Sequence, residues 1–319
     1  MSAIWLTWEI QRRNRSLARA VGATLHEMLY SGNAVARYCV LISRTFRIVR
    51  KSRPGVIYYQ NPSLILSALL ATMKFLGLTR ARLVGDFHNA GVYPPVARFL
   101  VPWIVRNSDL VIVTNSNLES AIKALGGRCM SLPDPIPQLH GARRAPAGTA
   151  HVFDVFFVCS WAPDEPIVEV LNAAKIIAQQ QPGMVVSITG RPKLERIGWT
   201  EPVPSNVRLT GFLSEHDFEQ HLLDAAVVLD LTTRADCMVC GAYEATSAEV
   251  PMVLSDNPPT RAYFRKGALF TSNTAGSIAD ELLRAYECHA QLRADVVALK
   301  RELMTDEQAN LQRLVEFTR

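Results

Sequence analysis

The sequence predicts an α/β protein built from two doubly wound, Rossmann-like domains, and three observations support this prediction. The chain has 319 residues, about twice the usual length of a single domain. Hydrophobic residues make up 49% of the chain and charged residues 20%, which suffices for two cores and excludes an intrinsically disordered protein. Short apolar runs alternate with helical patterns throughout, as is typical of parallel sheets covered on both faces.

In the first half, apolar runs predict six strands and the intervals between them predict five helices. The strands are at 4–8, 24–28, 56–60, 82–87, 110–114 and 129–132. The helices are near 10–21, 35–52, 62–77, 95–106 and 117–126. Prolines then interrupt both periodicities and predict a linker over 135–150.

The same alternation restarts after the linker. Strands are expected at 154–160, 185–189, 207–210, 227–231, 252–255 and 268–270. Helices are expected near 165–180, 215–224, 240–248, 259–264, 275–290 and 292–316. We therefore expect domains at 1–134 and 151–295, a C-terminal helical segment at 296–319, and a ligand cleft between the domains at the carboxyl ends of their strands.

Charge is distributed unevenly about this linker. Residues 1–150 hold 19 Lys and Arg against 6 Asp and Glu, a net charge of +13, and the remainder holds 15 against 23, a net charge of −8. The amino terminus shows no signal-peptide pattern, and the six cysteines lack the spacing of a disulfide framework. These features predict a cytoplasmic protein.

Cys237 and Cys240 form a CxxC motif that admits two interpretations. Together with Cys288 and His289 they would supply four zinc ligands. Structural zinc sites usually show two closely spaced pairs of ligands, so ordinary thiols near a helix start are favoured and no metal is expected.

Several motifs that specify other chemistries are absent from the sequence. No GxGxxG follows either first strand, which disfavours a nicotinamide dehydrogenase. No GxxxxGK[ST] occurs, which excludes a P-loop nucleotidase. There is also no Asp-x-Asp, which disfavours enzymes that hold a diphosphate through a metal on such a pair.

The loop and helix after the strand at 227–231 hold the most informative residues. Asp236 and Glu244 are separated by seven residues, across a predicted helix start. A carboxylate can accept both vicinal hydroxyls of a ribose, and the free N–H groups near 239–241 would attract a diphosphate. The alternative interpretation is a loop acid and an exposed helix face.

At these residues the sequence resembles the two-domain (GT-B) retaining glycosyltransferases of family 4, also called group 1. The resemblance covers most of the chain in layout and is specific from about 185 to 256. It rests on Asp236-x7-Glu244, Gly241, Glu244-Ala245, Glu249-Val250-Pro251-Met252-Val253, Ile188-Thr189-Gly190 and Val207-Arg208-Leu209-Thr210-Gly211-Phe212. It implies that Asp236 acts beside the sugar and that Gly190, Cys240, Gly241 and Glu244 bind the donor.

The sequence departs from this family at two points. The first acid is Asp236 rather than Glu, which is one methylene shorter. The Arg and Lys that clamp the donor diphosphate in the family are missing, because the matching loop at 160–166 has no cation. Arg191 and Arg234 are the nearest replacements, unless they are ordinary surface arginines.

In the first half, the resemblance implies that His88 contacts the donor sugar or the acceptor, with Asp86 and Asn89 orienting it. The alternative is a structural histidine at a strand end. Glu9 and Arg13 resemble a subset of the family that has TWE-x-x-RR-x-R at this point, and they are expected to touch acceptor or donor phosphate or to be solvated. Asn61 is a further acceptor-side candidate.

The helix at 35–52 predicts a membrane contact. Arg37, Arg44, Arg47 and Lys51 share one face, with Arg50 nearby. The expected core-facing side carries Tyr38, Leu41, Ile42, Thr45, Ile48 and Val49. Such a face is attracted to an anionic leaflet by about 1 kcal/mol per basic residue. The alternative is a solvated basic face, and nucleic acid is disfavoured because no nucleic-acid-binding motif is present.

Taken together, these features predict a cytoplasmic glycosyltransferase at the inner face of the cell membrane. It would move a sugar from a nucleotide-diphosphate donor to an acceptor, a lipid-linked saccharide of bacterial polysaccharide or glycolipid synthesis. By resemblance, the reaction proceeds with retention and needs neither metal nor cofactor. The alternatives are a nucleotide-sugar 2-epimerase of the same fold and a non-catalytic subunit of that fold.

Overall fold

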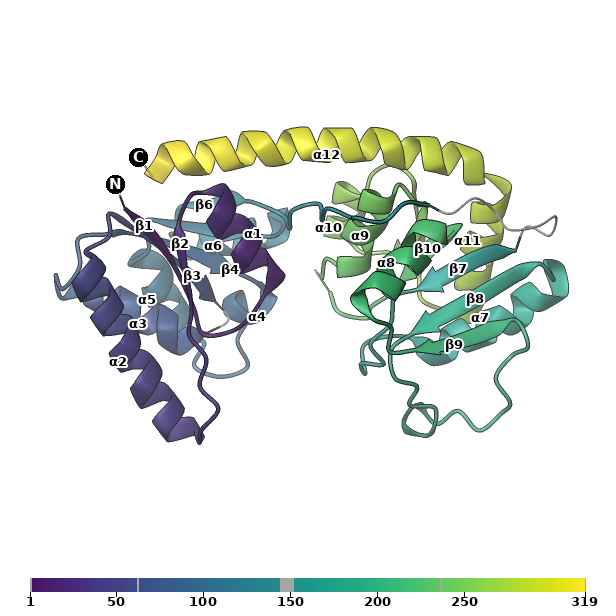
Figure 1. Cartoon of the computed structure of the whole chain (residues 1–319), viewed down its shortest axis with the longest axis horizontal. Helices are drawn as coiled ribbons and strands as arrows, with labels where there is room; N and C mark the ends of the chain where they lie inside the picture. The colour runs from purple at the N-terminus through teal and green to yellow at the C-terminus, as the bar shows by residue number, and fades with distance from the viewer. Residues whose placement is uncertain (1, 62, 144–151, 236, 319) are drawn as a thin grey trace. The chain divides into compact units, whose positions relative to one another are not determined.

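The computed structural model describes residues 2–61, 63–143, 152–235 and 237–318, which form two compact units (Figure 1). Unit 1 comprises Met1–Pro135 and Thr305–Arg319, and unit 2 comprises Ile136–Met304. The final helix, α12 (His289–Thr318), therefore contributes to both units. It begins before residue 296, where the sequence predicted a separate helical segment.

Unit 1 contains a six-stranded parallel sheet in the order β2-β1-β3-β4-β5-β6. Its strands are β1 (Ala3–Thr7), β2 (Thr24–Glu27), β3 (Val56–Asn61), β4 (Arg82–Phe87), β5 (Leu110–Val113) and β6 (Cys129–Ser131). Its helices are α1 (Arg12–Ala20), α2 (Ala34–Ser52), α3 (Leu64–Phe75), α4 (Asn89–Val92), α5 (Leu100–Arg106) and α6 (Ser116–Ala124).

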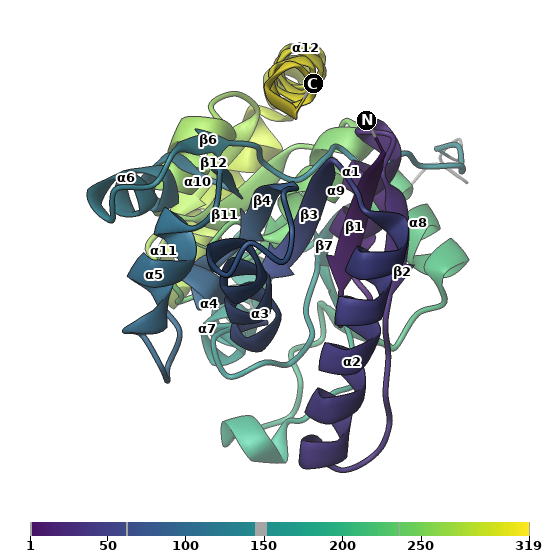
Figure 2. The same ribbon diagram turned by 90° about the vertical axis from the view of Figure 1, so that its left-hand side faces the viewer.

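Helices cover both faces of this sheet (Figure 2). One core holds Leu41 of α2, Leu70 of α3 and Ile104 of α5 against β1 residues such as Leu6. The core on the other face holds α1 and the last turns of α12. Because both faces are covered, β3 is buried along its whole length, which explains its continuous apolar start.

Unit 2 contains a second six-stranded parallel sheet, in the order β12-β11-β10-β7-β8-β9. Its strands are β7 (Phe153–Phe157), β8 (Met184–Thr189), β9 (Val207–Gly211), β10 (Val227–Asp230), β11 (Met252–Ser255) and β12 (Ala268–Thr271). Its helices are α7 (Ile167–Gln180), the short 3-10 turn η1 (Glu195–Ile197), α8 (Glu215–Asp224), α9 (Cys240–Ala248), α10 (Pro258–Tyr263) and α11 (Ala275–Glu287), together with the start of α12.

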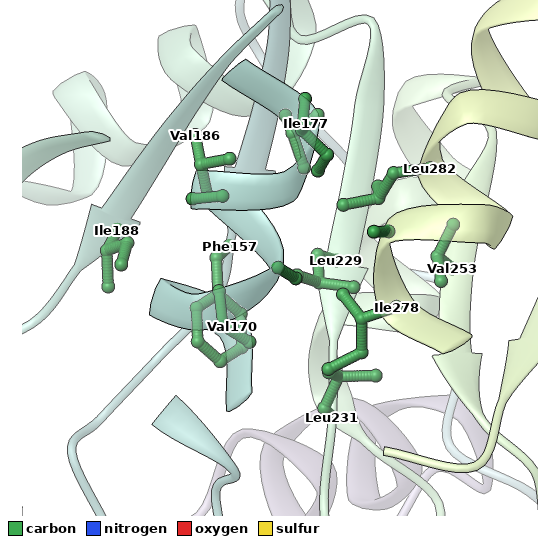
Figure 3. Packing of buried hydrophobic residues seen from close by; sticks show 14 of the residues in the cluster. Phe157, Val170, Ile177, Val186, Ile188, Leu229, Leu231, Val253, Ile278 and Leu282 are labelled. Atoms are coloured by element: carbon green, nitrogen blue, oxygen red, sulfur yellow. The ribbon is translucent and has the colours of Figure 1, made fainter. Parts of the chain in front are cut away.

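Alternate residues of the central strand β7 point into two cores. Phe157 packs with α7 and α11, and Phe156 packs on the opposite face with α8, α9 and α12. Figure 3 shows Phe157 beside Val170 and Leu229 in the first of these cores. Each fully buried side chain of this size stabilises the fold by roughly 1.5–3 kcal/mol.

Two sequence-predicted segments differ from the structure. The helix expected at 95–106 forms only from Leu100, because Ala97 has a left-handed backbone with φ of 56° and Pro95 precedes it. The expected linker at 135–150 is partly ordered onto unit 2, since Ile136 and Leu139 pack against its second core. Residues 144–151 lie outside the described residues.

The strand orders show where each unit would bind a ligand. In unit 1 the chain reverses direction across the sheet between β1 and β3, and in unit 2 between β7 and β10. Ligands of doubly wound sheets bind at the carboxyl ends of the strands beside such a switch point. No described helix is long and apolar enough to cross a membrane.

Candidate active site

In unit 2, the carboxyl end of β10 is coupled directly to the start of α9. Asp230, the last residue of β10, is buried, and its Oδ2 accepts the N–H of Gly241 at 2.7 Å. Gly241 is the second residue of α9, and the amide that the sequence predicted to face a diphosphate is therefore engaged by the protein. Burial, with the charges of Glu244 and Glu165, raises the pKa of Asp230 well above its ordinary value despite this hydrogen bond.

The loop after β7 takes its shape from a second carboxylate. Glu165 accepts the N–H groups of Ser160 at 2.9 Å and Ala162 at 2.7 Å. These amides belong to the loop at 160–166, where the family resemblance implies a diphosphate clamp. The loop after β7 thus lacks the family's cations, and the carboxylate of Glu165 occupies two of its backbone N–H groups. This arrangement does not by itself attract an anion.

Gly190 follows β8 and is required where this strand passes the β7 loop. It has φ of 82°, and a Cβ built on it would lie 2.4 Å from the backbone oxygen of Cys159. The next residue, Arg191, is exposed, and its guanidinium carbon lies 5.9 Å from the ring centroid of Phe212.

The remaining donor-side candidates lie on the loop and helix after β10. Arg234 is exposed and pairs with Asp164 at 2.9 Å, so it is connected to the β7 loop. Cys240 is exposed and begins α9, and Glu244 is partly buried within the same helix. Asp236 lies outside the described residues.

In unit 1, the carboxyl ends of β1 and β3 hold a buried hydrogen-bond network. Asn14 of α1 accepts the indole N–H of Trp5 at 3.1 Å. Its amide donates to Gln60 at 2.8 Å, and the hydroxyl of Thr7 donates to the same oxygen at 2.6 Å. This network fixes α1 on the edge of the sheet and supports the residues that follow β1.

Arg13, next to this network, forms a buried ion pair with Asp86 of β4. Its Nε lies 2.9 Å from Asp86, its Nη1 lies 2.8 Å from Asp134, and its Nη2 donates to the backbone oxygen of Leu132 at 2.7 Å. Arg13 is 6% exposed and Asp86 is 1% exposed. Arg13 is therefore not solvated, and its donors are directed into the protein. It supports the carboxyl ends of the strands.

His88 lies at the edge of this ion pair, close to Asp86, the residue that the sequence predicted to orient it. Its Nε2 is 3.6 Å from Oδ2 of Asp86, and its side chain is 28% exposed. Burial alone would raise the pKa of Asp86, but the charges of Arg13 and His88 and the hydrogen bonds from Arg13 hold it below its ordinary range. Asp86 thereby presents a fixed negative charge to His88.

The other acceptor-side candidates surround the end of β3. Asn61 is fully buried, and both polar atoms of its side chain lack hydrogen-bond partners within the described chain. Gly91 packs on it, since a Cβ there would lie 2.8 Å from Cγ of Asn61. Asn89 begins α4, and Glu9 is partly buried after β1. Thus His88, Asn89, Asn61 and Glu9 all lie at the carboxyl edge of one sheet.

The three cysteines of the alternative zinc interpretation form no disulfide within the described residues. Cys237 is partly buried, and Cys240 and Cys288 are exposed. Within the described ranges, no three His, Cys, Asp or Glu side chains gather in a way that could hold a metal. Burial raises the pKa of the Cys237 thiol, so it is less reactive than a free thiol.

The residues that sequence reasoning missed mostly hold the strand ends and loops of the candidate site in place. Gln60, Asn14, Asp230 and Glu165 build the two strand edges, yet none lies in a recognisable motif. Asp230 carried one usable signal, because a single acid closes the apolar run of β10 at the position where cleft residues belong.

Unit 2 matches a known protein family. Residues 151–302 match the family model described as Glycosyl transferases group 1. The protein is a glycosyltransferase with the GT-B fold. The matched residues cover almost all of unit 2, including both loops of the candidate donor site. No curated protein sequence matches the glycosyltransferase.

Solved structures share the fold of the glycosyltransferase over its whole length. Anabaena HepE in complex with UDP and glucose has a TM-score of 0.71 at 15% identity, covering 98% of this chain and 91% of that chain. The lipopolysaccharide outer core galactosyltransferase WaaB has a TM-score of 0.67 at 10% identity, covering 98% and 99%. A Listeria monocytogenes protein named as a UDP-N-acetylglucosamine 2-epimerase has a TM-score of 0.57 at 10% identity, covering 98% and 97%. At these identities the likeness concerns the fold.

Replacing Asp86 by Asn tests the buried ion pair. The variant keeps the shape of the side chain but leaves Arg13 without its main counter-charge, so we expect the free energy of unfolding at pH 7 to fall by roughly 3–5 kcal/mol. Urea denaturation measures this change. The control is Glu27→Gln, which breaks the more exposed pair with Arg15 and is expected to cost about 0–1 kcal/mol.

The same pair predicts a pH dependence of stability. Because folding lowers the pKa of Asp86, its stabilising contribution is fully present above the unfolded value of about 3.9 and is lost as the pH falls below it. The wild type should therefore lose stability below about pH 4 more steeply than Asp86→Asn. Parallel profiles for the two proteins would contradict the assigned role.

Replacing Gly241 by Ala tests the packing of the α9 start on Asp230. The new Cβ would lie 2.5 Å from Oδ2 of Asp230, which is itself buried, so we expect a loss of roughly 1–3 kcal/mol in unfolding free energy. Gly276 is also the second residue of a helix, and a Cβ there has nothing within 4 Å. Gly276→Ala should be neutral or stabilising by up to about 1 kcal/mol, and equal effects at both sites would refute the contact.

Proposed function

We propose that the enzyme transfers a sugar from a nucleotide-diphosphate donor, bound by unit 2, to a hydroxyl of a saccharide acceptor, bound by unit 1. The observation that supports this most strongly is the β10–loop–α9 segment with Gly241 and Glu244, because it lies within the residues that match the glycosyltransferase group 1 family. Complexes of HepE with UDP, and with UDP and glucose, support a uridine diphosphate donor.

In this proposal Glu244 accepts the two hydroxyls of the donor ribose. It lies on the fifth residue of α9 and is partly buried, so its carboxylate is held by the helix and still reaches solvent. A bidentate carboxylate suits vicinal hydroxyls. Gly190 leaves room beside the β7 loop, where a side chain would collide with the backbone.

The diphosphate would be neutralised by Arg191 and Arg234. Both are exposed, and they lie on loops after β8 and β10 on either side of β7 in the sheet. Arg234 would exchange its pair with Asp164 for a phosphate oxygen. The remaining N–H groups of the α9 start add a partial positive charge.

The reaction would proceed with retention and without a metal. The bond between the anomeric carbon and the diphosphate oxygen breaks, and the acceptor oxygen forms the new bond on the same face. The acceptor proton passes to the departing diphosphate, so no protein nucleophile is needed. Two features support this route: the family resemblance, and the absence of an Asp-x-Asp motif from the sequence.

His88 would contact the transferred sugar or the acceptor hydroxyl. Asp86 lies beside Nε2 of His88, which leaves Nδ1 as the ring nitrogen that Asp86 does not engage. Asn61 supports an acceptor site nearby, because its buried amide has no hydrogen-bond partner among the described residues and is therefore suited to hydrogen bonding with a saccharide hydroxyl. Glu9 and Asn89 complete the polar edge.

We propose further that the acceptor is lipid-linked and that α2 docks the enzyme on the inner face of the cell membrane. Leu41, Thr45 and Val49 form the buried stripe of α2. Arg44, Arg47, Arg50 and Lys51 are exposed, whereas Arg37 is partly buried. Tyr38, expected on the core-facing side, is 38% exposed, so the amino-terminal turn of α2 presents aromatic as well as basic side chains.

A non-catalytic role has one specific observation in its favour. Asp230 and Glu165 occupy backbone N–H groups at the switch point of unit 2, where the family binds a diphosphate. The 2-epimerase alternative rests on shared fold. Ligand binding and product analysis distinguish these alternatives from the transferase.

A thermal-shift panel of UDP-, GDP- and dTDP-linked sugars tests the donor site. We expect stabilisation by a UDP-sugar, because a ligand that binds only the folded state raises its stability by mass action. Glu244→Ala should weaken donor binding by roughly 10- to 100-fold without unfolding the protein. Glu287→Ala, an exposed acid at the end of α11, is the matched control.

Three outcomes separate the alternatives. No shift with any nucleotide sugar would support the non-catalytic subunit. Epimerised sugar formed from the donor alone would identify an epimerase. Unchanged donor affinity in Glu244→Ala would remove this residue from the site even if transfer occurs.

Cosedimentation with vesicles tests the membrane proposal. Replacing Arg44, Arg47 and Lys51 by Ala should lower binding to phosphatidylglycerol vesicles by about 100-fold, since each basic residue contributes about 1 kcal/mol. The control removes the same charge from unit 2, at the exposed Arg196, Arg208 and Arg284. Equal losses in the two triple variants would show that only net charge matters.

A further inference from the structure

A cavity lies at the amino ends of the unit 1 strands, at the opposite edge of the sheet from the acceptor-side residues. Its volume is about 620 Å³, within the usual range of ligand pockets. Its lining includes Arg82, Arg106, Arg128, Ser108, Asp109 and Phe317. None of these residues belongs to the candidate active site.

The topology of the sheet brings the three arginines together. Arg82 is the first residue of β4, Arg106 is the last residue of α5, and Arg128 immediately precedes β6. Strands β4, β5 and β6 are parallel neighbours, so the segments that enter them meet at one edge. All three side chains are exposed.

The carboxylate in this lining does not neutralise the arginines. Oδ2 of Asp109 accepts the N–H of Leu83 at 2.6 Å and also pairs with the ammonium of Lys74. The charge of Asp109 is therefore balanced by Lys74. The three arginines retain a surplus positive charge, and their mutual repulsion favours any ligand that supplies the missing anion.

Most of the guanidinium hydrogen-bond donors are also available. Arg82 donates from Nη1 to the backbone oxygen of Phe317, and the guanidinium carbon of Arg128 lies 5.2 Å from the ring centroid of Phe317. The guanidinium of Arg106 has no hydrogen-bond, ion-pair or ring partner in the described part of the chain. The contacts to Phe317 thus use one donor of Arg82 and one face of Arg128.

The geometry points to a second binding site, which takes a phosphoryl group. The planar donor fork of arginine matches phosphate oxygens in a bidentate manner. Phe317 supplies an apolar wall for the rest of the ligand. The phosphoryl group comes from a phosphorylated small molecule or from a lipid headgroup, and the two arms of the experiment distinguish these sources.

The first arm is calorimetric titration of the full chain with inorganic pyrophosphate. Arg106→Ala should weaken binding by about tenfold or more and should leave the unfolding temperature unchanged, because the guanidinium of Arg106 forms no hydrogen bond or ion pair within the described residues. Arg80→Ala removes an exposed arginine outside the lining and should have no effect on binding. Arg191→Ala combined with Arg234→Ala removes the proposed donor cations and should leave this binding in place.

The second arm uses vesicles of phosphatidylcholine with and without phosphatidylglycerol, in the background of the α2 triple alanine variant. Binding that requires the anionic lipid and is lost in Arg106→Glu identifies a headgroup as the source. Pyrophosphate binding that is weakened in Arg106→Ala identifies a soluble ligand. If neither probe binds, or if both bind equally well to the Arg106 variants, the inference is overturned.

Discussion

The buried ion pair between Arg13 and Asp86 determines how the carboxyl edge of unit 1 is built. It joins α1 to β4, and the same guanidinium reaches Asp134 and the backbone oxygen that follows β6. Two charges removed from water stabilise a fold only when the remaining donors and acceptors are also satisfied. All three guanidinium nitrogens of Arg13 have partners, among Asp86, Asp134 and the backbone oxygen of Leu132. This arrangement leaves Asp86 charged beside His88.

In unit 2, the carboxyl edge of the sheet is held instead by acidic side chains that bind backbone amides. Asp230 engages the start of α9, and Glu165 engages the loop after β7. Both acids hold a strand-to-helix connection in a fixed shape without a side-chain cation. The consequence is electrostatic, because the proposed diphosphate would find its positive partners on exposed arginines rather than in the loop itself. Arg191 and Arg234 are the exposed arginines on the adjoining loops.

The sequence was sufficient to predict most of the fold. Continuous apolar runs, such as those of β3 and β10, favoured buried strands. Amphipathic segments such as α2 favoured helices, and the alternation of the two patterns predicted parallel sheets. The helix expected at 95–106 was shortened by the left-handed backbone of Ala97, which the periodicity of the sequence did not reveal. For the site, motifs predicted Glu244 and His88, which stay predictions, but they did not predict the partners of Arg13, which come from residues 73 and 121 positions away. Such pairings depend on strand order, which periodicity does not specify.

The basic residues of the first half therefore fall into groups that differ in burial and in their acidic partners. Arg13 is internal, and its charge is cancelled by two acids. The exposed arginines of α2 lie on a helix whose other side is fixed by Leu41 and Val49. Arg82, Arg106 and Arg128 share a cavity whose acid is already paired. Only the last two groups hold charge that a partner can neutralise. Because they lie on different elements, each can be altered without disturbing the ion pair that supports His88.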